Sequence, residues 1–156
     1  KMRANLGIMI TASHNPFYDN GIKLFDGAGN KISDALEQQI EAMMEAPMVC
    51  QDSKNLGKAK RIADATGRYV EFCKSSVPNG FSLRGMKIVL DCAHGATYQA
   101  APQVFSELGA DVVVVAADPN GFNINKECGS THPEHLQQRV VEDVRAVGAG
   151  EHHHPR

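Results

Sequence analysis

The sequence has no tryptophan, few aromatic residues and no large excess of either charge. Aromatic residues make up 6% of the 156 positions, and the formal net charge is -2. A protein without a broad positive field is poorly suited to bind the phosphate backbone of a nucleic acid. We therefore expect no nucleic-acid partner, whereas a small anionic substrate bound by local donors remains possible.

Long apolar runs and closely paired cysteines are also missing. The most apolar run, residues 112–117, is far shorter than the roughly 20 residues that cross a bilayer, so we expect no membrane association. The cysteines contain no Cys-x-x-Cys pair, which argues against a zinc knuckle or a redox motif. Nothing else points to secretion, so we expect reduced thiols and a cytoplasmic location. The four cysteines are Cys50, Cys73, Cys92 and Cys128.

The remaining composition is that of an ordinary globular protein, with 42% hydrophobic and 22% charged residues. Both ends of the chain look truncated. Residues 1–6 run directly into a strand pattern, and residues 147–156 interrupt a helical pattern abruptly. We interpret the three consecutive histidines at 152–154 as a tag remnant or truncation scar rather than a metal site.

The first half of the chain predicts two strands followed by two helices. Consecutive apolar residues at 7–11 predict a short strand that is buried on both faces. Turn residues then lead to a second strand at 22–25, so Ser13 is expected on a loop between two strands. A helix from about residue 59 to 76 is also expected. Before it, Ser33 is expected to cap a helix whose core stripe is Leu36, Ile40, Met43 and Met44.

The second half predicts alternating strands and helices. Strands are expected at 87–91 and 112–115, separated by a helix that carries Ala100, Val104 and Leu108 and ends at a left-handed Gly109. A last helix is expected to begin near Pro133, since proline is favoured in the first helical turn. This alternation is typical of an α/β layer with parallel strands.

A turn-rich break at residues 78–82 predicts a domain boundary. We assign residues 1–80 to one domain, residues 81–147 to a second, and residues 148–156 to a tail outside both. The expected fold class is α/β, with two consecutive α/β layer domains that are both truncated.

Ser13 and His14 are the first residues that suggest catalysis. Neighbours in an extended chain point to opposite faces, so a hydrolase dyad between them is disfavoured. The Gly-x-Ser-x-Gly elbow of the α/β-hydrolases is absent as well. Local chemistry alone therefore favours a strand-ending turn, in which Ser13 and Asn15 bond the backbone and Pro16 fixes the exit.

A longer motif changes this interpretation. It spans residues 7–23, and its core is Ala12-Ser13-His14-Asn15-Pro16-Phe17-Tyr18-Asp19-Asn20-Gly21-Ile22-Lys23. This segment closely resembles the active-site serine segment of the α-D-phosphohexomutase superfamily, and its residue pattern is most similar to the hexosamine-phosphate branch. Residues 91–98, 119–125 and 128–131 are also similar to that branch, so the resemblance covers nearly all of residues 7–146.

The resemblance implies a phosphoryl carrier. Ser13 would carry a phosphate, pass it to one sugar oxygen to form a bisphosphate, and recover the other phosphate. Lys23 is the implied neutralising or proton-handling residue, and His14 and Asn15 are implied to orient the loop. His14 thereby joins Ser13 and Lys23 in the implied catalytic set, and Asn15 is an implied substrate-binding residue. His94, in a loop after a predicted parallel strand, is a candidate for substrate binding. The implied reaction interconverts glucosamine 6-phosphate and glucosamine 1-phosphate, which feeds UDP-N-acetylglucosamine synthesis.

The sequence departs from the family at its metal site. Family members hold Mg²⁺ between the phosphoserine and three aspartates of an Asp-Gly-Asp-Gly-Asp-Arg loop, and this chain contains no such string. Only Ser13, through its phosphate, would contribute a ligand here. Two alternatives therefore stay open, namely a sister mutase for mannose or glucose phosphates and a non-catalytic fragment. The sequence gives no prediction of oligomeric state.

Overall fold

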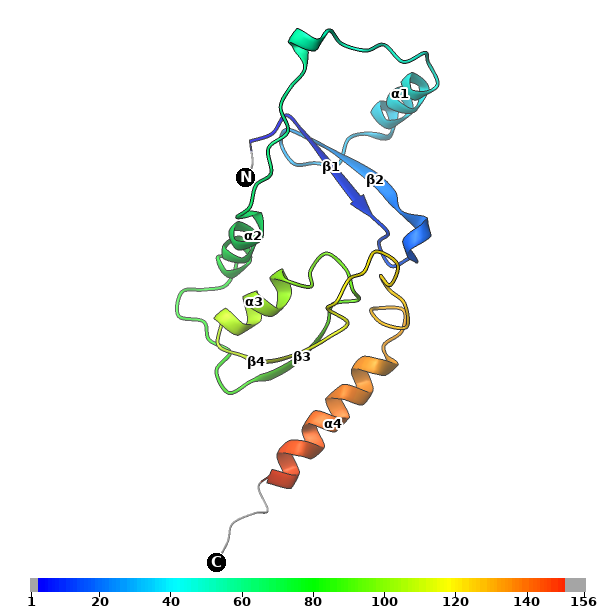
Figure 1. Cartoon of the computed structure of the whole chain (residues 1–156). Coiled ribbons are helices and arrows are strands. Elements are labelled where there is room, and N and C mark those ends of the chain that lie inside the picture. The colour runs from blue at the N-terminus through cyan, green and yellow to red at the C-terminus, as the bar shows by residue number, and fades with distance from the viewer. Residues whose placement is uncertain (1–2, 151–156) are drawn as a thin grey trace, which may run out of the picture. The chain divides into compact units, whose positions relative to one another are not determined.

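The computed structural model describes residues 3–150, with side chains described through residue 145. The chain forms two compact units (Figure 1). The first unit comprises residues 1–11 and 20–61, and the second comprises residues 12–19 and 62–156. The segment that contains Ser13 therefore belongs to the second unit, although the strands on either side of it belong to the first. The domain boundary near residue 80 stays a prediction.

The first unit is built on an antiparallel hairpin. β1 (Leu6–Thr11) pairs with β2 (Gly21–Asp26), with Ile8 opposite Leu24 and Ile10 opposite Ile22. Both strands were predicted, but the expected burial of the first on both faces is wrong. Ile8 is 64% exposed and Ile10 is 73% exposed, because the described residues supply no further layer over this sheet.

The helix of the first unit has the expected cap. α1 (Asp34–Met44) begins after Ser33, whose Oγ accepts a hydrogen bond from the Leu36 amide at 3.3 Å. The expected core stripe is wrong for the described residues, since Leu36, Met43 and Met44 are all exposed. Helical periodicity identified the apolar side of α1 correctly, but no described element covers that side.

The second unit begins with a shorter helix than the sequence predicts. α2 (Ala65–Lys74) starts six residues after the expected position at residue 59. Cations are unfavourable at the positive end of a helix, and the segment before α2 carries Lys58, Lys60 and Arg61. This charge explains why the helical pattern is not realised there.

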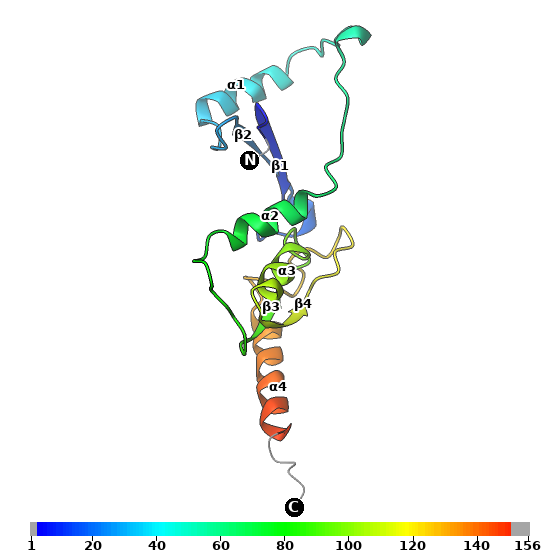
Figure 2. The same ribbon diagram turned by 90° about the vertical axis from the view of Figure 1, so that its left-hand side faces the viewer.

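The core of the second unit is a pair of parallel strands with helices packed on it. β3 (Lys87–Asp91) and β4 (Asp111–Val115) are paired from Lys87 opposite Asp111 to Asp91 opposite Val115. The connecting helix α3 (Ala100–Glu107) packs on both strands and against α2 (Figure 2). Gly109 has the predicted left-handed conformation, with φ of 99°.

The last helix follows the prediction at its start but not at its end. α4 (Glu134–Gly150) begins directly after Pro133 and packs against β3. The expected break at residue 147 is wrong, because the helix continues through the Gly-Ala-Gly stretch. Glycine weakens a helix by about 1 kcal/mol relative to alanine without necessarily ending it. The histidines at 152–154 lie outside the described residues.

These elements confirm the α/β fold class, and the parallel pairing of β3 with β4 was also predicted. In the described part of the chain, none of the helices combines the length and apolar character that a transmembrane span requires.

Candidate functional site

Ser13 lies in a segment of two consecutive tight turns. The Asn15 amide donates to the Ala12 carbonyl at 2.9 Å, and the Asp19 amide donates to the Pro16 carbonyl at 3.0 Å. Proline suits the start of the second turn because its ring fixes φ. We call residues 12–19 the serine loop. The strand-ending turn expected from local chemistry is therefore present.

The backbone of Ser13 corrects one sequence-based expectation. Its φ is 54°, in the left-handed region, rather than extended. The side chains of Ser13 and His14 consequently do not point to opposite faces, and Ser13 Oγ lies 3.4 Å from His14 Nδ1. This separation is longer than the usual 2.7–3.0 Å of a hydrogen bond from a hydroxyl. The pair thus has proximity without the short contact of a hydrolase dyad.

A left-handed conformation at a non-glycine residue costs roughly 1–2 kcal/mol and persists only where the surroundings enforce it. Among the described residues of the second unit it occurs at six non-glycine positions, all of them in or beside the serine loop and the carboxyl ends of β3 and β4. Such clusters are typical of functional sites. The six are Ser13, Ala93, His94, Ala116, Asn125 and Glu127.

Two loops meet at the carboxyl ends of the parallel strands. Residues 92–95 follow β3, and the long loop of residues 116–132 follows β4. Asp91 joins them, since its carboxylate accepts from the Ala93 amide at 2.8 Å and from the Gly129 amide at 2.7 Å. The Asn125 amide donates to the Ala93 carbonyl at 2.9 Å. These bonds fix the 116–132 loop on the end of β3.

The 116–132 loop holds the serine loop directly. Asn125 Nδ2 donates to the carbonyl oxygens of Ser13 at 2.9 Å and Asn15 at 2.8 Å. The rings of Phe17 and Phe122 meet edge to face, with centroids 5.3 Å apart. Residues separated by more than 100 positions in the sequence thus form one site within the second unit.

Between the serine loop and the 116–132 loop lies a hollow of about 490 Å³. Its lining is mixed, with aromatic rings, two histidines, a lysine and a glutamate. A mainly apolar lining with a few polar groups suits a small organic molecule. The lining residues are His14, Pro16, Phe17 and Tyr18 from the serine loop, and Phe122, Ile124, Asn125, Lys126, Glu127, Thr131 and His132 from the 116–132 loop.

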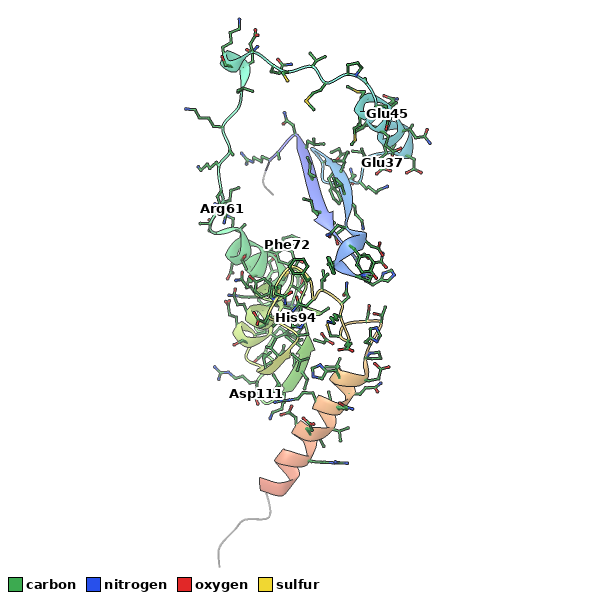
Figure 3. All side chains as sticks on the ribbon, turned by 45° about the vertical axis from the view of Figure 1, so that its right-hand side comes forward. Glu37, Glu45, Arg61, Phe72, His94 and Asp111 are labelled. Atoms are coloured by element: carbon green, nitrogen blue, oxygen red, sulfur yellow. The ribbon has the colours of Figure 1, made fainter. Side chains whose placement is uncertain are left out.

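His94 occupies the predicted position after β3 (Figure 3). Its backbone amide donates to the Ala116 carbonyl, and its Nδ1 accepts from the Asp118 amide at 3.1 Å. The ring therefore holds the start of the 116–132 loop, and the bond leaves Nε2 as the nitrogen that carries the proton in the neutral ring. His94 does not line the hollow.

Lys23 belongs to the first unit, on β2 opposite Met9, and its side chain is exposed. His14 and Asn15 lie in the serine loop of the second unit, as predicted. The sequence predicted no role for Asn125, Phe122 or Asp91. One signal was available, because asparagine is enriched in left-handed and turn positions and the 116–132 loop has three in six residues. They are Asn120, Asn123 and Asn125.

The described residues do not form a complete metal site. Among residues 3–145, no three histidine, cysteine, aspartate or glutamate side chains come together in a way that would hold a metal ion. Magnesium sites in proteins use carboxylates together with phosphate oxygens and water. A magnesium ion thus does not fit the described residues alone.

Comparison with known proteins identifies relatives over most of the chain. Residues 1–48 match the family model for phosphoglucomutase/phosphomannomutase, alpha/beta/alpha domain I. The chain is 59% identical over 147 residues to phosphoglucosamine mutase of Pseudomonas syringae pv. tomato, and 59% identical over 146 residues to that of Photorhabdus laumondii. Each match covers 94% of this chain and 33% of the relative. The chain thus spans about a third of the length of these relatives.

A solved structure gives the same fold. It belongs to a phosphoglucomutase/phosphomannomutase family protein from Burkholderia thailandensis, with a TM-score of 0.60 and 23% sequence identity. The superposition covers 88% of this chain and 28% of the solved one. At this identity the likeness concerns the fold alone, which supports the assignment of truncated α/β domains.

Proposed function

We propose that this chain, as a segment of a phosphohexomutase family protein, supplies the phosphoryl-carrying serine of a longer enzyme, a phosphoglucosamine mutase. The observation that carries this proposal is the identity of 59% to phosphoglucosamine mutases over 94% of the chain. The proposed reaction interconverts glucosamine 6-phosphate and glucosamine 1-phosphate. We propose a cytoplasmic location for the protein, consistent with its four free thiols.

In this proposal Ser13 exchanges a phosphoryl group with the sugar. The bond between phosphorus and the Ser13 oxygen breaks, a bond to one sugar hydroxyl oxygen forms, and the proton of that hydroxyl is transferred to the serine oxygen. The reverse steps at the other sugar phosphate restore phosphoserine and release product. Phosphoryl transfer depends mainly on positioning and charge neutralisation. The serine loop is suited to this because its carbonyls are held from outside.

The other predicted residues receive roles around Ser13. We assign Lys23 to charge neutralisation or proton transfer, and His14, which lines the hollow, to a contact with the reacting group. Asn15 would orient the loop and meet the sugar phosphate. His94 is retained as a substrate-binding candidate through the loop that it holds.

We propose Mg²⁺ as the cofactor of the complete enzyme. When bound, it would neutralise the charge of phosphate oxygens. Ser13 would contribute one ligand through its phosphate. The carboxylate ligands must come from outside the described residues, which contain no such cluster.

The test uses the full-length protein that contains this chain. We expect turnover with glucosamine phosphates that exceeds turnover with mannose or glucose phosphates, and phosphate on Ser13 by peptide mass spectrometry. Ser13→Ala should lower kcat by at least about 10³-fold, as expected for loss of a covalent carrier. Ser53→Ala, on an exposed turn, is the matched control and should retain full activity.

Two results would contradict the proposal. Retained turnover in Ser13→Ala would exclude Ser13 as the carrier. Preference for mannose or glucose phosphates would instead assign the chain to a sister mutase.

A further inference from the structure

The side chain of Asn125 contacts the serine loop at two points. Its Nδ2 group donates to the carbonyls of Ser13 and Asn15, at 2.9 and 2.8 Å. Both partners are backbone carbonyls, which only accept, so the amide must direct its NH₂ end toward them. The two carbonyls lie on either side of His14. One side chain therefore holds the backbone on both sides of His14.

Asn125 is itself held by the ends of the parallel strands. Its backbone amide donates to the Ala93 carbonyl at 2.9 Å, and its φ of 57° is a left-handed conformation that asparagine tolerates well. The next turn of the same loop is fixed by the bond from the Gly129 amide to Asp91 at the end of β3. The side-chain NH₂ group that holds the serine loop is thus anchored to the end of β3 through the backbone of its own loop.

We propose that Asn125 is a positioning residue for Ser13, holding the serine loop in the geometry that phosphoryl transfer requires; this rests on the function proposed above. In-line transfer depends on the placement of the attacking and leaving oxygens, and a misplacement of about 1 Å can cost roughly 100-fold in rate. Asn125 Nδ2 holds the backbone of Ser13 through its carbonyl oxygen. Loss of the two bonds should therefore impair transfer more than sugar binding.

The test compares the same substitution at two asparagines of one loop. Asn125→Asp keeps the size and the left-handed preference but replaces the donors by an oxygen that repels the two carbonyls. Asn123→Asp is the control, because Asn123 Nδ2 donates to the Asp118 carbonyl within its own loop. Asn125→Gly and Asn123→Gly form a second, uncharged pair, since glycine accepts the backbone conformation.

All variants are made in the full-length protein and assayed with glucosamine 6-phosphate. We expect the Asn125 variants to lower kcat by roughly 10- to 100-fold with KM changed less than about threefold. The single-turnover rate of transfer from phosphorylated Ser13 should fall by the same factor. The Asn123 variants should stay within about threefold of the original kcat.

Several outcomes would overturn the inference. One is equal loss of kcat in the Asn123 and Asn125 variants, which would indicate general damage to the loop. Another is a rise in KM at constant kcat, which would make Asn125 a sugar contact. Unchanged kinetics in both Asn125 variants, with Ser13→Ala inactive, would refute the positioning role and leave the proposed function intact. An inactive original protein would instead refute the function.

Discussion

Gly129 shows how closely the loops of the site approach one another. Its φ is 77°, and a Cβ added there would lie 2.8 Å from the Cβ of Ala93. Its amide also donates to the Asp91 carboxylate at 2.7 Å. The backbone of the 116–132 loop can approach the end of β3 this closely because residue 129 has no side chain. The position of Asn125, four residues earlier, depends on that approach.

We predict that Gly129→Ala lowers the free energy of unfolding of the second unit by about 2–4 kcal/mol. The left-handed conformation accounts for about 1–2 kcal/mol, and the close contact adds a similar amount. Gly121→Ala is the control, since Gly121 has φ of 89° but no atom within 4 Å of the added Cβ. It should cost only the conformational part. Urea unfolding followed by circular dichroism measures both, and equal losses would show that the contact with Ala93 is unimportant.

At the scale of elements, the sequence predicted the strands and helices better than their burial. β3, α3, β4 and the start of α4 follow directly from apolar periodicity and from Gly109 and Pro133. Burial was overestimated at Ile8, Ile10 and the α1 stripe, because periodicity identifies an apolar face without identifying what covers it. The chain spans about a third of the length of its relatives.

The site was predicted less completely than the elements. Ser13 and His14 could be named as candidates because they lie in one continuous motif, and their roles stay predictions. Asn125 could not be assigned its role, because its partners Ser13 and Asn15 are 112 and 110 residues away and the contact is a side-chain amide on an irregular loop. No sequence period specifies such a contact.

The exposed hairpin face gives a prediction that depends on context. In the 156-residue chain, Ile10→Ala should change the free energy of unfolding by less than about 0.5 kcal/mol, as for other surface positions. In the full-length protein we expect a loss of about 2–5 kcal/mol, because a covering layer there would bury the side chain. Val70→Ala is the control, since Val70 is 1% exposed and should be costly in both proteins. Urea titrations decide, and a small effect of Ile10→Ala in the full-length protein would contradict the argument.

At the scale of the whole molecule, the cysteines distinguish the two compact units. Cys50 is exposed in the first unit, whereas Cys92 and Cys128 are buried in the second, at 4% and 2% exposure. Burial raises the pKa of both buried thiols, and the negative charge of Asp91 raises each pKa further. Both effects disfavour the thiolate, which is the reactive form. Cys50 therefore reports on the first unit, and Cys92 and Cys128 report on the second, whose remaining thiol, Cys73, is only half-buried.

We predict that Ellman's reagent at pH 8 modifies Cys50 at the rate of a free thiol, and Cys92 and Cys128 at least about 100-fold more slowly, since they react only after local opening.

The raised pKa values of Cys92 and Cys128 also fix the direction in which stability changes with pH. The folded state keeps these protons above roughly pH 8.5, where an unfolded thiol loses its proton, so the free energy of unfolding falls as pH rises through that value. Replacing both buried cysteines by alanine should reduce this fall, whereas Cys50→Ser should not. An unaltered pH dependence in the double variant, compared by urea unfolding between pH 7 and pH 10, would show that the buried thiols do not cause it.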